Sequence, residues 1–260
     1  MKIMALGDIF GRGGRNYVRN HLSELKKEYE ADFVVINCEN ASAGSGLTEK
    51  NAKELLEVTD VNVYTSGNHI WDKKDINNII QQSNRLIRPA NYPDPCPGRG
   101  YEIYRFQNKR IGVVNLAGTA LMECLNNPFL EFDRIYQKIA TACDIIIVDF
   151  HAETTSEKIA FGYYLDGRAN VVFGTHTHVP TADERILDNG TGYLTDLGMC
   201  GPLEGVIGVD KDIIIKKFLT QRHVRFEVAE GKTQINGAVF TLDDDTNKCI
   251  GIQRIRKIFD

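Results

Sequence analysis

The sequence has no apolar run that approaches the roughly 20 residues needed to cross a bilayer. Its first apolar stretch, Ile3 to Leu6, is too short for the hydrophobic part of a signal peptide, and Asp8 follows it closely. The six cysteines include no Cys-x-x-Cys pair. Without an export signal, we expect these thiols to stay reduced in a cytoplasmic protein that has no membrane partner.

An excess of charge of one sign is also missing. The formal net charge is only −4, from 31 basic and 35 acidic residues. A surface that coats nucleic acid would need a large positive excess, so the net charge does not indicate a nucleic-acid partner. The same net charge is compatible with a local basic pocket.

The composition is that of an ordinary globular protein. Apolar residues make up 42% of the sequence and charged residues 25%. The 260 residues are enough for one large domain with a substantial core. No internal repeat, low-complexity segment or clear linker interrupts the chain, so we expect a single domain over residues 1–260.

Polar residues follow five short apolar runs that have the pattern of buried strands. The runs are residues 2–6, 32–38, 61–64, 144–150 and 169–173. The residues that follow them are Asp8, Glu39, Asn40, Asn68, His69, His151, His176 and His178. Each alone has an ordinary explanation as a turn or core residue. Their shared position at strand carboxyl ends, where open α/β sheets bind ligands, favours a functional site.

Other segments complete an α/β pattern. Helical spacing and capping residues predict helices over residues 15–30, 48–57, 129–142, 153–165 and 210–219. Residues 101–106 and 110–116 predict a hairpin, and residues 192–197 a short strand. Alternating patterns predict antiparallel strands over residues 224–228, 233–242 and 249–255. The glycine-rich residues 7–14 predict a flexible turn.

The residues at the strand ends offer oxygen and imidazole ligands and no thiol, which suits iron, manganese or zinc. An extended His176-Thr177-His178 segment would send both imidazoles to one face. Seven ligands are too many for one metal with an open position, so we predict two metal ions, with Glu39 as the bridging carboxylate. Two divalent ions would keep residual positive charge beside Asp8, Glu39 and a bridging hydroxide, and would attract phosphate. His69 is then left over, and we assign it as the general acid for the leaving oxygen.

The order of these residues resembles a known family, the calcineurin-like metallophosphoesterases. The motifs are Gly7-Asp8, Glu39-Asn40, Gly67-Asn68-His69, His151 and Gly174-Thr175-His176-Thr177-His178. Most members carry a histidine where this sequence has Phe10, and a second aspartate where it has Glu39-Asn40. One branch, the bacterial YmdB-like phosphodiesterases, shares these departures.

The resemblance implies a four-layer αββα sandwich of two mixed β-sheets flanked by helices. It implies a di-iron site, with manganese or zinc as alternatives. One metal would take Asp8, Glu39, Asn40 and His178, and the other Glu39, Asn68, His151 and His176. His69 would be the proton donor. The implied activity is hydrolysis of 2′,3′-cyclic and 3′,5′-cyclic nucleotides by a metal-dependent phosphodiesterase, and the implied assembly is a homo-oligomer.

Three rival hypotheses remain open. The same metal site could serve an RNA nuclease or a phosphoprotein phosphatase, or a regulatory scaffold with slow turnover. A nuclease would need a basic track, to which these arginines could contribute: Arg12, Arg15, Arg85, Arg88 and Arg99. A nucleotide base would need an aromatic partner, for which the candidates are Phe10, Trp71, Phe161 and Tyr163.

Overall fold

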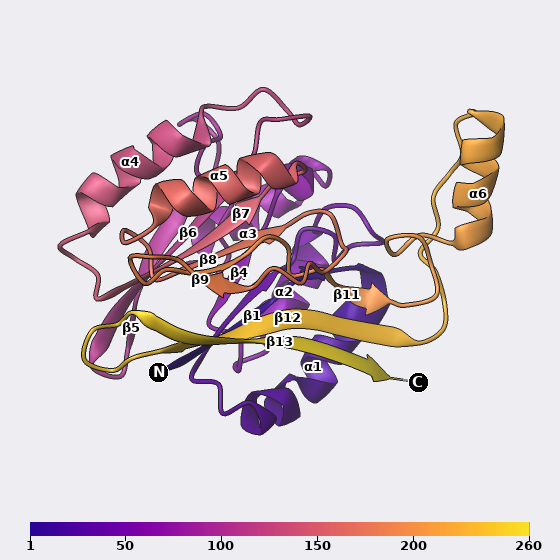
Figure 1. Cartoon of the computed structure of the whole chain (residues 1–260). Helices are drawn as coiled ribbons and strands as arrows, with labels where there is room; N and C mark the ends of the chain where they lie inside the picture. The colour runs from indigo at the N-terminus through magenta and orange to yellow at the C-terminus, as the bar shows by residue number, and fades with distance from the viewer. Residues whose placement is uncertain (260) are drawn as a thin grey trace.

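The computed structural model describes residues 1–259, which form two β-sheets packed face to face (Figure 1). The strands are β1 (Lys2–Leu6), β2 (Asp8–Ile9), β3 (Phe33–Asn37), β4 (Val63–Thr65), β5 (Tyr101–Phe106), β6 (Lys109–Ala117), β7 (Ile145–His151), β8 (Val171–Thr175), β9 (Arg185–Ile186), β10 (Gly192–Leu194), β11 (Met199–Pro202), β12 (Thr233–Leu242) and β13 (Cys249–Phe259). The helices are α1 (Gly11–Glu28), α2 (Glu49–Leu56), the short 3₁₀ helix η1 (Asn68–Trp71), α3 (Ile76–Gln82), α4 (Pro128–Ile139), α5 (Thr155–Leu165) and α6 (Lys211–Thr220).

Both sheets are mixed. The first has the strand order β2-β11-β12-β1-β3-β4, and β13 pairs with β12. The second has the order β5-β6-β7-β8-β10-β9. Strands β1, β3 and β4 run parallel, as do β6, β7, β8 and β10, whereas β12 runs antiparallel to β1. The parallel strands carry their polar residues at a common end, which positions the site described below.

Three hydrophobic cores hold four layers together. The core between the sheets contains fully buried Ile3 and Phe33 from the first sheet and Ile147 and Phe173 from the second. Helices α1, α2 and α3 pack on the outer face of the first sheet, and α4 and α5 on that of the second. The predicted four-layer αββα sandwich is therefore confirmed.

The glycine-rich turn was predicted wrongly in part, because α1 begins at Gly11 and not at Arg15. Gly14 lies inside this helix, directly against the backbone of β11. A Cβ at Gly14 would overlap the carbonyl oxygen of Cys200. Glycine is present here because the helix approaches the strand closely. From the sequence alone, the glycines had indicated a flexible turn.

Residues 203–232, between β11 and β12, contribute no strand to either sheet. Helix α6 lies in this segment and stands away from the sandwich (Figure 1). The strand predicted over residues 224–228 is wrong: only Val228 forms an isolated bridge, with Val209. Both sides of β12 are already paired, so no sheet edge is open there for this segment.

Two further observations concern thiols and membranes. The six cysteines of the described chain are all free, including fully buried Cys38 and Cys200. Within residues 1–259 no helix combines the length and apolar character needed to cross a bilayer.

Candidate metal centre

The predicted ligands converge where polar ends of the two sheets meet. Asp8 begins β2, and Glu39 and Asn40 follow β3 in the first sheet. From the second sheet, His151 ends β7, and His176 follows β8. Asp8, Glu39 and His151 are fully buried. Residues far apart in the chain thus share one small, largely dry volume.

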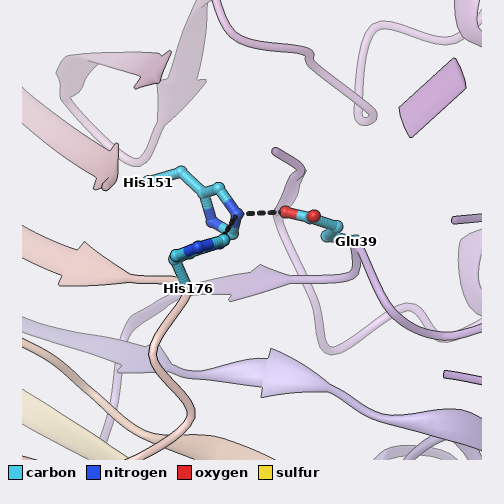
Figure 2. Close-up of side chains that lie close together, drawn as sticks. All are labelled: Glu39, His151 and His176. Carbon is cyan, nitrogen blue, oxygen red and sulfur yellow. Dashed lines mark hydrogen bonds and ion pairs between the residues drawn. The ribbon is translucent and has the colours of Figure 1, made fainter. Parts of the chain in front are cut away.

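Three of these side chains form a compact group (Figure 2). Glu39 Oε2 contacts His151 Nε2, and His176 Nδ1 lies 3.0 Å from the same nitrogen. One ligand atom from each residue lies within 4.8 Å of the other two. A metal ion needs such a convergence of oxygen and nitrogen atoms.

A second group lies beside the first. Asp8 Oδ1 is 3.8 Å from His151 Nδ1 and 3.9 Å from His178 Nε2. Asn40 Nδ2 lies 3.0 Å from His178 Nε2. These distances connect Asp8, Asn40 and His178 to the Glu39–His151–His176 group, so six of the seven predicted ligands are linked by direct contacts.

The seventh, Asn68, is placed next to this group by the chain itself. It follows Gly67 at the end of β4, and its side-chain oxygen is buried. A Cβ at Gly67 would overlap Glu39 Oε2 and His151 Nε2. The backbone therefore passes directly against the ligand atoms, which only a glycine permits.

Hydrogen bonds assign the protons on the two buried imidazoles. Thr175 Oγ1 donates to Asp149 Oδ1 at 2.7 Å, so it accepts from His151 Nδ1–H at 2.8 Å. His178 Nδ1–H donates to the carbonyl oxygen of Ile207 at 2.9 Å. Both rings then present an unprotonated Nε2 to the centre, which is the form that binds metal.

His176 completes this arrangement from the cleft side. Its Nε2 lies 3.0 Å from Glu153 Oε2, which leaves a lone pair on Nδ1. That lone pair faces the lone pair of His151 Nε2 at 3.0 Å. Two facing lone pairs repel each other unless a cation lies between or beside them, so the pair is suited to a shared or neighbouring metal.

Unpaired buried oxygens point to the same conclusion. Within residues 1–259, Asp8 Oδ1, Glu39 Oε2 and Asn68 Oδ1 are buried and have no hydrogen-bond partner. Burial raises the pKa of Asp8 to about 7 and also raises the pKa of Glu39. Such groups are costly without a partner. The donor set therefore fits metal ions, which would satisfy these oxygens together.

Burial has the opposite effect on the imidazoles. It lowers the pKa of His151 to about 3 and that of His176 to about 3, with a smaller contribution for His176 from the neighbouring His151. It also lowers the pKa of His178. All three rings are therefore neutral near pH 7 and available as ligands.

The sequence predicted an extended His176-Thr177-His178 segment, and this prediction is wrong, because the segment forms a turn. His176 has φ 100° and His178 φ 66°, a region that non-glycine residues rarely adopt. Asp196 holds the turn: its Oδ2 accepts from Thr177 Oγ1 at 2.7 Å and pairs with Lys158 Nζ at 2.6 Å. Both imidazoles reach the centre through this turn and not through strand alternation.

Sequence reasoning missed the residues that orient the ligands: Asp149, Glu153, Lys158, Thr175 and Asp196. One signal was available for Asp149, because it lies two residues before His151 on a strand and so shares its face. The stretch Asp196-Leu197-Gly198-Met199 also resembles the YmdB-like branch, but nothing in the spacing links Asp196 to Lys158, because the two are 38 residues apart and meet only in the fold.

His69 lies at the edge of the centre, with its side chain 41% exposed. Its backbone N–H donates to Glu39 Oε1 at 3.0 Å. Its ring Nδ1 lies 2.9 Å from Asp72 Oδ2, and its Nε2 lies 3.9 Å from Glu39 Oε1. The ring lines a cleft of about 490 Å³, together with Asn40, His176 and His178.

The family of the chain follows from sequence comparison. Residues 4–255 match the family model described as YmdB-like protein, and the chain belongs to that family. Over 255 residues it is 47% identical to the 2′,3′-cyclic-nucleotide 2′-phosphodiesterase of Bacillus subtilis (strain 168), covering 98% of this chain and 96% of the relative.

Two solved structures have the same fold over the whole chain. A novel phosphatase from Mycoplasma pneumoniae is 40% identical with a TM-score of 0.93, covering 100% of this chain and 94% of that one. A hypothetical protein from Thermus thermophilus is 34% identical with a TM-score of 0.92, covering 100% of both chains.

Proposed function

We propose that the protein is a metal-dependent phosphoric diester hydrolase that acts on 2′,3′-cyclic nucleotides. The observation that carries the proposal is the convergence of unpaired buried oxygens and unprotonated imidazole nitrogens at the floor of a cleft. The name of the B. subtilis relative supports the substrate class. Activity on 3′,5′-cyclic nucleotides is a further part of the proposal, based on family resemblance.

The proposed ligands form two sets that share Glu39. One set is Asp8, Glu39, Asn40 and His178, and the other is Glu39, Asn68, His151 and His176. Two bound metal ions, for which we propose iron with manganese or zinc as alternatives, would supply a hydroxide nucleophile and Lewis acids for the phosphoryl oxygens.

We propose His69 as the general acid. The bond from phosphorus to O2′ breaks during hydrolysis, and that oxygen needs a proton. Asp72 accepts from Nδ1–H of His69, which directs the other ring nitrogen, Nε2, away from Asp72. An imidazole at the edge of the cleft can donate from Nε2 and regain its proton from solvent.

The experiment that tests the function joins metal analysis to hydrolysis. Purified protein is analysed for iron, manganese and zinc, then assayed with 2′,3′-cyclic AMP, 3′,5′-cyclic AMP, bis-p-nitrophenyl phosphate and a phosphopeptide. We expect two metals per chain and the highest kcat/KM for 2′,3′-cyclic AMP. A protein that stays inactive on all four substrates after reconstitution with iron or manganese would leave only the scaffold hypothesis, and activity on the phosphopeptide alone would favour the phosphatase.

The arginines do not favour the nuclease alternative. Arg85 and Arg88 donate to backbone carbonyls of their own neighbourhood. Arg15 pairs with Glu54, and Arg99 pairs with Glu102. Only Arg12 of the five is exposed without a hydrogen bond or ion pair to the described residues. A single such arginine is a weak electrostatic track for RNA.

Three more parts of the proposal concern the whole molecule. We propose one domain over residues 1–260, because the core between the sheets takes buried residues from both of them. We propose a homo-oligomer, since α6 exposes Ile215, Phe218 and Leu219. We retain a cytoplasmic location from the unpaired cysteines.

A further inference from the structure

Residues 203–232 are not needed to complete either sheet, yet they lie over the candidate metal centre. The carbonyl oxygen of Ile207 accepts the hydrogen bond from His178 Nδ1 at 2.9 Å. Val209 bridges back to Val206 and forward to Val228, which ties the two ends of the segment together. The segment is therefore held beside the cleft by a hydrogen bond from His178, a proposed metal ligand, and by bridges between its own residues.

The cleft has two chemically different sides. Its polar side carries Asn40, His69, Glu153, His176 and His178. Its apolar side is formed by Phe10, Ile207, Val209, Phe226 and Val228, four of which come from residues 203–232, and the same segment also contributes Glu227 to the lining. A cleft with polar groups at one side and an apolar wall at the other is typical of small-molecule sites. Its volume, about 490 Å³, is in the range of such sites.

Phe226 is the aromatic residue of this wall that is open to a ligand. It is 51% exposed, whereas Phe10 is only 4% exposed and packs edge-on against His178. The ring of Phe226 has Lys217 Nζ 4.7 Å from its centroid, a cation–π contact with α6 that restrains it. An exposed, restrained phenyl ring in a cleft offers a flat surface for stacking.

The aromatic candidates named from the sequence do not compete for this role. Phe161 is fully buried in the core under α5, where it stacks on Phe150. Tyr163 lies under Arg185, and Trp71 packs edge-on against Tyr92. None of Phe161, Tyr163 and Trp71 lines the cleft.

We propose that Phe226 is the platform on which the base of the nucleotide stacks while the cyclic phosphate lies at the polar side. The inference rests on the proposed function, because it requires a substrate with a base attached to the phosphate-bearing ribose. Stacking on a phenyl ring strengthens binding by roughly ten- to hundredfold per base, and every base has a face that can stack. The wall therefore increases affinity for nucleotides as a class.

The test compares a substrate with a base and a substrate without one. Metal-loaded protein is assayed with 2′,3′-cyclic AMP and with the 2′,3′-cyclic phosphate of 1-O-methylribose, which lacks the base. We expect Phe226→Ala to raise KM for 2′,3′-cyclic AMP by roughly ten- to hundredfold with little change in kcat. The same variant should leave kcat/KM for the base-free substrate unchanged, and Phe226→Tyr should retain wild-type KM values.

Tyr163→Ala is the matched control, because Tyr163 is an aromatic residue that is 58% exposed on α5 and does not line the cleft. It should leave both substrates unaffected. Equal losses on both substrates with Phe226→Ala, or no loss on either, would overturn the role of Phe226 while the proposed function stands. A wild-type protein that hydrolyses neither substrate would instead overturn the proposed function, and this inference with it.

Discussion

Lys158 and Asp196 form an ion pair that is closed off from solvent: Nζ lies 2.6 Å from Oδ2, and both side chains are 1% exposed. Asp196 also accepts from Thr177 and from the backbone N–H of Gly198. Through Thr177, this pair holds the turn that carries His176 and His178. A charge on α5 thus supports two of the proposed ligands without touching them.

The first prediction follows from this pair. Lys158→Met would leave the Asp196 carboxylate buried and unpaired, which costs about 3–5 kcal/mol of folding free energy. Chemical denaturation measures the loss. The exposed pair between Lys257 and Glu28 is the control, since solvent screens this pair and Lys257→Met should cost far less than Lys158→Met. A cost for Lys158→Met as small as that of the control would show that Asp196 finds compensation elsewhere.

The second prediction concerns the glycine against the ligand atoms. Gly67→Ala places a methyl group where Glu39 Oε2 and His151 Nε2 lie, so we expect metal content to fall to background. Elemental analysis measures it, and circular dichroism checks the fold. Gly13→Ala is the control, because a Cβ there meets only Thr233 Oγ1 at 3.6 Å. Normal metal content in Gly67→Ala would remove the proposed ligands near Gly67 from the centre.

The third prediction separates proton donation from metal binding. His69→Ala should keep its metal while kcat for 2′,3′-cyclic AMP falls by ~10²–10⁴, the usual contribution of a general acid. Glu39→Gln should instead lose metal, because it changes the proposed bridging carboxylate. Metal analysis and steady-state kinetics on both variants check this. Unchanged turnover in His69→Ala would exclude His69 from the mechanism.

The fourth prediction is a pH dependence of metal binding. Burial raises the pKa of Asp8 to about 7 in the metal-free protein, so below pH 7 this carboxyl is protonated and must release a proton to bind metal. Affinity should therefore fall about tenfold per pH unit below about 7 for each proton displaced, and level off above it. His151, with its pKa lowered to about 3, adds no proton in this range.

Chelator competition between pH 5.5 and 8 measures this affinity. Calorimetry in buffers of different ionisation heats counts the protons released on binding. Asp8→Asn removes the titrating group, so its affinity should be weaker than that of the wild type and should vary less with pH. An affinity that is independent of pH in the wild type would show that the metal displaces no proton from Asp8.

The fold and the candidate ligands were readable from the sequence for one reason. Parallel strands that are buried on both faces appear as apolar runs, and the residue after each run marks the edge where ligands gather. Asp8 and His151 are found in this way although 143 positions separate them in the printed sequence. The spacing also predicts the hairpin between β5 and β6, which the structure confirms.

The parts that failed depend on tertiary contacts. The glycines of α1 look like a turn because nothing in the sequence shows that Gly14 meets Cys200. The turn that carries His176 and His178 is predicted as extended because the residue that stabilises it, Asp196, lies elsewhere in the chain. Phe226 sits in a segment with the alternation of a strand, and only the fully paired β12 shows that this segment must lie outside the sheet.

The proposed centre draws on both halves of the chain and on both sheets. Glu39 belongs to the first sheet, and His151 and His176 to the second. Neither half could assemble the ligands before the other had folded, so metal capture would come late in folding and would report a completed sandwich. A bound ion would then link the two sheets and raise the free energy of unfolding. Removal of the metal would therefore destabilise the fold as well as stop the reaction.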